Sequence, residues 1–160
     1  IKYLQSGEQS IAIVLSKIKE HLKTIRRGTR GSTQILIPLQ QLDKEHWTLL
    51  EIVLEPDNKS GGCTNTIAKC YDSKGWASNS NFVDFWVNPR RIIYVKNCVN
   101  EQFGVDIEWI REGKQGVIDE HNCGRYTLIK MGQLLRVKNA PESIDGINRV
   151  LATRKLYMGN

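Results

Sequence analysis

The sequence predicts an α+β layered domain in which a central mixed β-sheet is flanked by helices. The order of the expected elements is the first reason, because a helix is followed by a run of strands and then by further helices. The second reason is the hydrophobic period, which changes from helical spacing near the start to short aliphatic runs in the middle. At 160 residues, the chain fits one compact domain with a sizeable core.

The first expected element is an amphipathic helix over residues 9–23. Its apolar side chains recur every three or four residues, and lysines and a glutamate occupy the other side; the apolar positions are Ile11, Val14, Leu15, Ile18 and Leu22. A basic turn with two glycines follows over residues 26–33. The aliphatic run Gln34–Leu39 then predicts a buried strand that stops at Pro38 and Leu39.

The middle of the chain predicts a hairpin. Trp47–Leu54 and Thr66–Tyr71 read as its two strands, and the polar, glycine-bearing stretch Glu55–Asn65 reads as its loop. A short helix with Asn79 or Ser80 as its cap and Pro89 at its end comes next. Further short strands are expected at Arg91–Cys98 and Val105–Ile110.

Two helices are expected to complete the domain. The first covers Cys123–Val137, and its predicted apolar side consists of Leu128, Met131, Leu134 and Leu135. The second covers Ser143–Leu156, with Ser143 as its N-cap. The chain begins at Ile1 rather than Met, so we expect this single domain, residues 1–160, to be part of a longer protein.

Composition narrows the classes of function. Hydrophobic residues make up 40% and charged residues 25%, as in soluble globular proteins, and no apolar run is long enough to span a bilayer. The net charge of +6 comes partly from a basic cluster, Lys23, Arg26, Arg27 and Arg30. Because no nucleic-acid recognition motif accompanies this cluster, we interpret it as a solvated turn and expect no nucleic-acid partner.

The four cysteines predict free thiols in an intracellular protein. They form no CxxC pair and none of the close ligand pairs that zinc sites use, so neither a metal site nor a disulfide framework is expected. We expect no cofactor and a monomeric protein. A lone cysteine in such a protein is a candidate nucleophile if a histidine can reach it.

The residue types that a thiol protease needs occur along the chain in a fixed order. They are His46-Trp47, then Tyr71-Asp72-Ser73, then Gln115, and finally Asn122-Cys123-Gly124. Such an enzyme requires a thiolate, an imidazole that accepts its proton, an acid that orients the imidazole, and donors for the oxyanion. Each member lies where a strand or helix is expected to end.

The predicted hairpin places His46 and Asp72 at the same open end, where the carboxylate can orient the imidazole. Cys123 begins a helix, and the helix dipole together with an imidazolium lowers the pKa of a thiol. Gln115, in the glycine-flanked loop Gly113–Gly116, is expected to donate its side-chain amide to the oxyanion. His121 is an alternative base, but it is too near Cys123 in sequence to reach both the thiol and an acid.

This set of motifs resembles the ubiquitin-like-protein proteases of clan CE. That superfamily includes SUMO proteases, adenovirus-type proteases, and bacterial effector deubiquitinases and acetyltransferases. The resemblance covers about residues 34 to 131, from the strand ending in Pro38 to the helix that Cys123 opens. It implies the cysteine-protease fold of adenovirus and SUMO proteases. Asn122 departs from the pattern, since family members typically have Asp before the nucleophile.

The resemblance implies a triad of His46, Asp72 and Cys123, with Gln115 in the oxyanion hole. It also implies that Trp47, with Gly124 and Asn122 beside the nucleophile, binds the Gly-Gly tail of the substrate. The expected activity is cleavage after the C-terminal Gly-Gly of ubiquitin or a ubiquitin-like modifier. A bacterial effector deubiquitinase delivered into the host cytoplasm is the preferred identity.

Two other functions remain open from the sequence. An effector acetyltransferase of the same clan would use Cys123 to carry acetyl from acetyl-CoA, although that branch commonly has Glu as the acid where Asp72 stands. An inactive module would keep the fold only to hold a ubiquitin-like protein.

Overall fold

A computed structural model describes residues 8–25, 31–41, 46–56, 63–74, 89–115 and 121–158. Within these ranges one sheet contains β1 (Thr33–Gln41), β2 (His46–Pro56), β3 (Cys63–Lys74) and β4 (Ile107–Gln115). The helices are α1 (Glu8–Ile25), α3 (Pro89–Phe103), α4 (Cys123–Leu134) and α5 (Ile144–Met158). The α+β class and the mixed sheet flanked by helices are therefore confirmed. The helix expected before Pro89 and the basic turn after α1 lie outside the described residues.

The strands follow one another across the sheet in chain order. β1 pairs antiparallel with β2, β2 pairs antiparallel with β3, and β3 pairs parallel with β4. The predicted hairpin of β2 and β3 is confirmed, but its strands are longer than expected. Glu55 and Asn65, both assigned to the loop from the sequence, are cross-strand partners, and the Asn65 amide donates to the Glu55 carboxylate at 3.3 Å.

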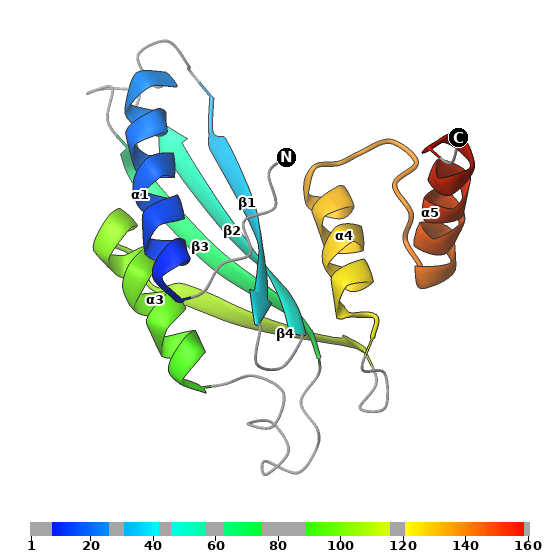
Figure 1. The fold of residues 1–160 in the computed structure, drawn as a ribbon. Helices are drawn as coiled ribbons and strands as arrows, with labels where there is room; N and C mark the ends of the chain where they lie inside the picture. The colour runs from blue at the N-terminus through cyan, green and yellow to red at the C-terminus, as the bar shows by residue number, and fades with distance from the viewer. Residues whose placement is uncertain are drawn as a thin grey trace.

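The helices cover the sheet from both sides. α1 and α3 lie together over one face and α4 lies over the other, with α5 beyond it (Figure 1). The main hydrophobic core fills the α1–α3 side, where Leu15 of α1, Leu50 and Ile52 of β2, and Val99 of α3 are fully buried. This confirms the amphipathic first helix. In the described part of the chain, no helix is both long and apolar enough to cross a membrane.

The prediction of a strand at Arg91–Cys98 is wrong, because these residues belong to helix α3. The run is rich in β-branched residues, which favours a strand locally. Its buried positions, however, recur at helical spacing, with Val95 at 2% exposure and Val99 at 0%. Pro89 is the first residue of this helix, as suits a residue without an N–H. A helix also meets the need for a crossover between the parallel strands β3 and β4.

Two strands run further than the sequence predicted. β1 continues through Pro38 to Gln41, which an edge strand allows because, among the described residues, one side of its backbone has no strand partner. β4 continues past Ile110 to Gln115, through polar residues that lack a strand pattern. The register shifts there, since the pairs Asp72–Arg111 and Lys74–Gln115 leave more residues on β4 than on β3. Gly113, with φ +65°, lies within this bulge.

Only part of the predicted apolar side of helix α4 is shielded from solvent. Of its four residues, Leu128 and Leu135 are exposed, at 46% and 54%, and Met131 and Leu134 are half-buried, whereas Cys123, Thr127 and Ile129 are buried. The Thr127 hydroxyl donates to the carbonyl oxygen of Cys123 at 3.0 Å, one turn back along the helix. The orientation of α4 is thus set by polar as well as apolar contacts.

The sheet face beneath α4 is itself polar. Glu51 accepts from the Gln34 amide at 2.6 Å and from the Tyr71 hydroxyl at 2.7 Å. Lys130 of α4 lies 4.2 Å from the centre of the Tyr71 ring and donates to Glu112 of β4. These contacts explain why a lysine, rather than one of the leucines, faces the sheet.

The N-cap predicted for α5 is present, because the Ser143 hydroxyl oxygen accepts from the Gly146 N–H at 3.2 Å. Ser143→Ala is expected to destabilise α5 by about 1 kcal/mol. Hydrogen exchange of the α5 amides should accordingly become about fivefold faster. The control is Ser16→Ala on the exposed side of α1, which removes no cap; equal exchange rates in α5 of both variants would contradict the prediction.

Candidate active site

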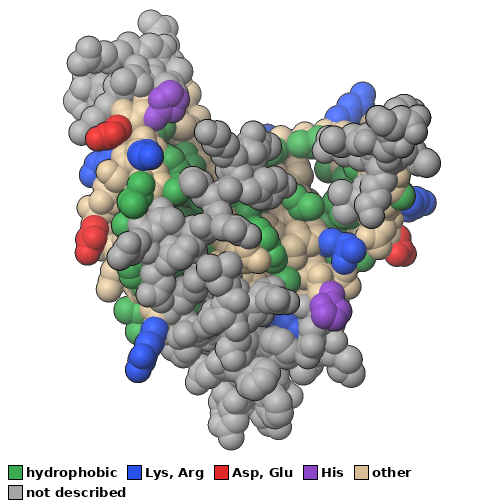
Figure 2. All heavy atoms as spheres, viewed as in Figure 1, with side chains coloured by type: hydrophobic (Ala, Val, Ile, Leu, Met, Phe, Trp, Pro, Cys, Tyr) green, Lys and Arg blue, Asp and Glu red, His purple; other side chains and the backbone are tan. Residues whose placement is uncertain are grey.

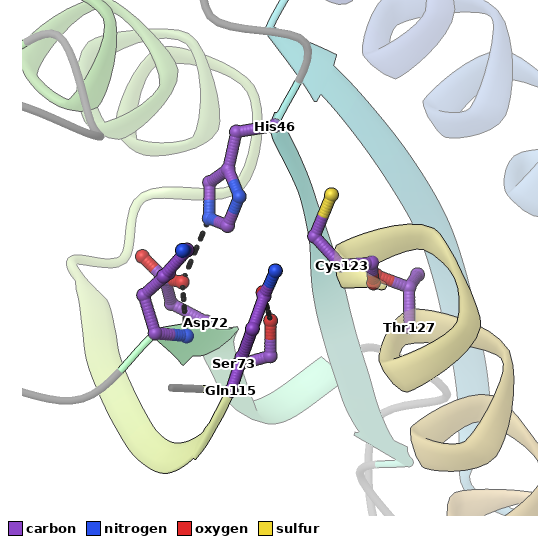
Figure 3. Close-up of polar contacts among 7 residues, drawn as sticks. His46, Asp72, Ser73, Gln115, Cys123 and Thr127 are labelled. Carbon is purple, nitrogen blue, oxygen red and sulfur yellow. Dashed lines mark hydrogen bonds and ion pairs between the residues drawn. The ribbon is translucent and has the colours of Figure 1, made fainter. Parts of the chain in front are cut away.

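Three segments that are far apart in sequence meet at one end of the sheet. His46 is the first residue of β2, Asp72 lies near the end of β3, and Cys123 is the first residue of α4. Figure 3 shows the His46 ring between Asp72 and Cys123. The sequence analysis placed these side chains at element ends, and the structure brings all three together.

The strand pairing brings His46 and Asp72 into contact. Asp72 pairs with Thr48, two residues along β2 from His46. The His46 Nε2 and the Asp72 Oδ1 are 2.8 Å apart, and the two residues are 2% and 0% exposed. The Lys74 backbone N–H donates to the same Oδ1 at 3.0 Å. The other oxygen of Asp72, Oδ2, is buried without a hydrogen-bond partner in the described part of the chain.

This carboxylate determines the charge of the imidazole. Burial alone lowers the pKa of His46, but hydrogen bonds with Asp72 and Cys123 and the charges of both groups raise it to about 9. A buried carboxylate with few hydrogen bonds needs a nearby cation. His46 is therefore held as an imidazolium at neutral pH, with Nε2 donating to Asp72 and its other ring nitrogen on the side of Cys123 (Figure 3).

Cys123 has a lowered thiol pKa. Burial raises this pKa, but a hydrogen bond with His46, the His46 charge and backbone hydrogen bonds from Trp47 and Gly124 together lower it. A backbone group lowers a thiol pKa only by stabilising the thiolate, so both amides act as N–H donors. The sequence analysis missed the Trp47 amide. A main-chain donor leaves no signature in side-chain types, and only the docking of α4 on β2 reveals it.

Cys70 provides a contrast within the same chain. It is fully buried, and burial, with the charge of Asp72, raises the pKa of its thiol although a hydrogen bond with Thr48 lowers it. Cys70, Cys98 and Cys123 are all free thiols, as predicted, while the side chain of Cys63 lies outside the described residues. Of the described cysteines, Cys123 is the one paired with a histidine.

Gln115 lies beside the triad, but on a strand rather than in the predicted loop. It is the last residue of β4, is 3% exposed, and pairs with Lys74. Its side-chain oxygen Oε1 accepts from the Ser73 hydroxyl at 2.7 Å. In Figure 3 the amide nitrogen is on the side away from Ser73, toward the space between His46 and Cys123.

The Trp47 indole packs against the start of α4. A Cβ placed on Gly124 would lie 3.5 Å from Trp47 Cδ1 and 3.7 Å from its Nε1. The indole therefore lies next to position 124, directly after Cys123 in the chain, and a Cβ there would meet it at an ordinary van der Waals distance.

The remaining predicted residues flank the nucleophile. Asn122 is the N-cap residue of α4, but its side chain caps no helix N–H; its Oδ1 instead accepts from Arg125 at 2.7 Å. The alternative base His121 is exposed, and the imidazole that hydrogen-bonds Cys123 is that of His46. Among the residues described, no group of three or more His, Cys, Asp or Glu is arranged to hold a metal ion.

Chemically, the site can form a thiolate beside an imidazolium. The thiolate is a nucleophile near neutral pH, and the imidazolium can protonate a leaving group. The Gln115 amide nitrogen faces the space between these two side chains (Figure 3), and a side-chain amide is a type of donor that stabilises an oxyanion. Comparison with protein-family models, curated proteins and solved structures gave no match to this chain.

Proposed function

We propose that the protein is a cysteine protease of the clan CE type, cleaving after the C-terminal Gly-Gly of ubiquitin or a ubiquitin-like modifier. The observation that carries the proposal is the buried contact of His46 with Asp72, together with the hydrogen bond between His46 and Cys123. A resting thiolate beside an oriented imidazolium has little use outside nucleophilic catalysis. The mixed sheet with the nucleophile at a helix start agrees with the cysteine-protease fold that the sequence resemblance implies.

In the proposed reaction the Cys123 thiolate attacks the carbonyl carbon of the terminal glycine. The Gln115 side-chain amide and the Cys123 backbone N–H stabilise the oxyanion. When the tetrahedral intermediate collapses, the C–N bond breaks and His46 gives its proton to the leaving amine. A water molecule, deprotonated by His46, then attacks the thioester, releasing the modifier and the thiolate.

The choice of a Gly-Gly tail comes from the sequence resemblance, which implies that Trp47 binds this tail. The indole lies beside Gly124, the residue after the nucleophile, and a peptide that approaches Cys123 past this aromatic side chain is least hindered if it carries glycines. The sequence resemblance also supplies the choice of ubiquitin as the substrate and of a bacterial effector that acts in a host cytoplasm. Its selection over SUMO is the part of the proposal that most needs measurement.

The test uses ubiquitin and SUMO carrying thiol-reactive groups at their C-termini. Incubation with the ubiquitin probe is expected to give a covalent adduct on Cys123, located by mass spectrometry. Cys123→Ala should abolish the adduct, whereas Cys98→Ala, a matched buried control, should retain it. If only the SUMO probe forms an adduct, the proposal of a cysteine protease stands but its substrate is SUMO rather than ubiquitin.

The competing activity is tested in parallel. If neither probe reacts and the protein instead acetylates itself from acetyl-CoA, in a manner that depends on Cys123, the acetyltransferase alternative replaces the protease. If neither occurs in the folded protein, the proposal of an enzyme fails and the inactive binding module remains.

A further inference from the structure

Ser73 is a buried serine that the proposed reaction does not use directly. It lies between Asp72 and Lys74, at the place where β3 and β4 change register. It is 6% exposed, and its hydroxyl donates to Gln115 Oε1 at 2.7 Å. The Ser73 hydroxyl thus donates to Gln115 and not to Asp72, whose Oδ1 receives Nε2 of His46 and the Lys74 N–H.

The hydrogen bond from Ser73 determines which way the Gln115 side-chain amide is turned, and the shape of the amide alone does not determine this. The oxygen and NH₂ ends of a glutamine amide have almost the same shape, but one accepts and the other donates. An oxyanion requires the NH₂ end, and an amide turned the other way would repel it. A donor held at the oxygen end favours the productive orientation, and the burial of both side chains keeps water from competing.

The bulge explains how the partners meet. β3 and β4 are parallel, and their register would otherwise continue from the pair Asp72–Arg111. The extra residues on β4, including Gly113 with φ +65°, bring Gln115 level with Lys74 and within reach of Ser73. Asp72 and Ser73 thus lie next to each other on β3 and contact different parts of the site.

We infer that Ser73 is a positioning residue that orients the Gln115 amide toward the oxyanion. Asp72 sets the direction of the imidazole, and Ser73 sets the direction of the oxyanion donor. This inference rests on the proposed function for its catalytic consequence, while the orientation of the amide is a property of the folded protein in any case.

The kinetic test is a double-mutant cycle of Ser73→Ala and Gln115→Ala, with a fluorogenic ubiquitin C-terminal amide as substrate. Ser73→Ala is expected to lower kcat about tenfold with little change in KM. Gln115→Ala is expected to lower kcat roughly 10²- to 10³-fold. In the Gln115→Ala background, Ser73→Ala should cause no further loss. Ser73→Thr, which retains a hydroxyl, should recover most of the activity.

The rate of Cys123 alkylation distinguishes a loss of Gln115 positioning from a general disruption of the active site. Ser73→Ala should leave the rate and pH profile of its reaction with iodoacetamide unchanged, because the thiolate depends on His46 and not on Gln115. A Ser73→Ala variant with full kcat, or one whose loss is the same with and without Gln115, would overturn the inference.

A second readout needs no activity. In ¹⁵N-labelled protein, Ser73→Ala should shift the side-chain NH₂ resonances of Gln115 from their wild-type positions, with the backbone resonances of α4 unchanged. If the wild type is inactive but these resonances move, the proposed function fails and the positioning role stands. Unmoved resonances would refute the positioning role, whether or not the protein is active.

Discussion

His46→Ala is expected to reduce kcat/KM by roughly 10⁴-fold or more, because it removes the base, the acid and the cation of the site together. It should also change the thiol itself. Burial raises the pKa of the Cys123 thiol. Without the imidazolium, the backbone N–H groups of Trp47 and Gly124 still oppose this effect but the contribution of His46 is lost, so the pKa must rise.

The pH dependence follows from the directions of the two shifts. Below the lowered pKa of Cys123 the thiol is protonated and unreactive; above about 9, His46 loses the proton that the leaving group needs. Proteolysis should therefore show a bell-shaped profile between these limits. Alkylation by iodoacetamide needs no general acid, so the wild type should show only the acid limb.

The measurement is the alkylation rate of Cys123 from about pH 5 to pH 10, followed by mass spectrometry. In His46→Ala the midpoint should move to higher pH than in the wild type. His121→Ala is the matched control, since that histidine is exposed. If the midpoint is unchanged in His46→Ala, or if it shifts in His121→Ala, the assignment of His46 as the base is wrong.

Asp72→Asn is the second large effect, expected to lower kcat roughly 10³- to 10⁴-fold. An asparagine keeps the shape of the side chain but removes the charge that holds a proton on His46. Burial then dominates, and the pKa of His46 should fall well below its value of about 9.

Titration of the His46 ring by NMR measures that fall directly. Asp106→Asn is the control, because Asp106 is exposed and contacts Asn100 rather than the site. Should His46 keep its raised pKa in Asp72→Asn, the cation would be stabilised by Cys123 and not by the carboxylate. Activity close to that of the wild type would contradict the role of Asp72 as orienter.

The contact of His46 with Asp72 was predicted because it rests on local signals, whereas that of His46 with Cys123 was expected from the order of the motifs and the family resemblance. The hairpin of β2 and β3 needs only two aliphatic runs and a polar loop, and its pairing places His46 near Asp72. Cys123 at a helix start needs only the apolar spacing that follows. Roles tied to element ends are therefore readable without tertiary information.

The elements that depend on tertiary contacts were predicted less well. The β-branched residues of α3 favour a strand, and only the crossover between parallel strands and the packing of Val95 and Val99 make the segment helical. Gln115 was expected in a loop because the residues before it are polar and show no strand pattern, although they form a bulged strand. The face of α4 depends on Lys130 and its partners on β3 and β4, which no pattern along the helix can indicate.

The position of Cys123 on α4, across from His46 on β2, makes its reactivity a reporter of local opening. A chain with α4 detached has an ordinary thiol, of which only about 1% is ionised near pH 6.5. The rate of alkylation at that pH therefore reports on the docking of α4, and a variant that loosens this helix should react more slowly.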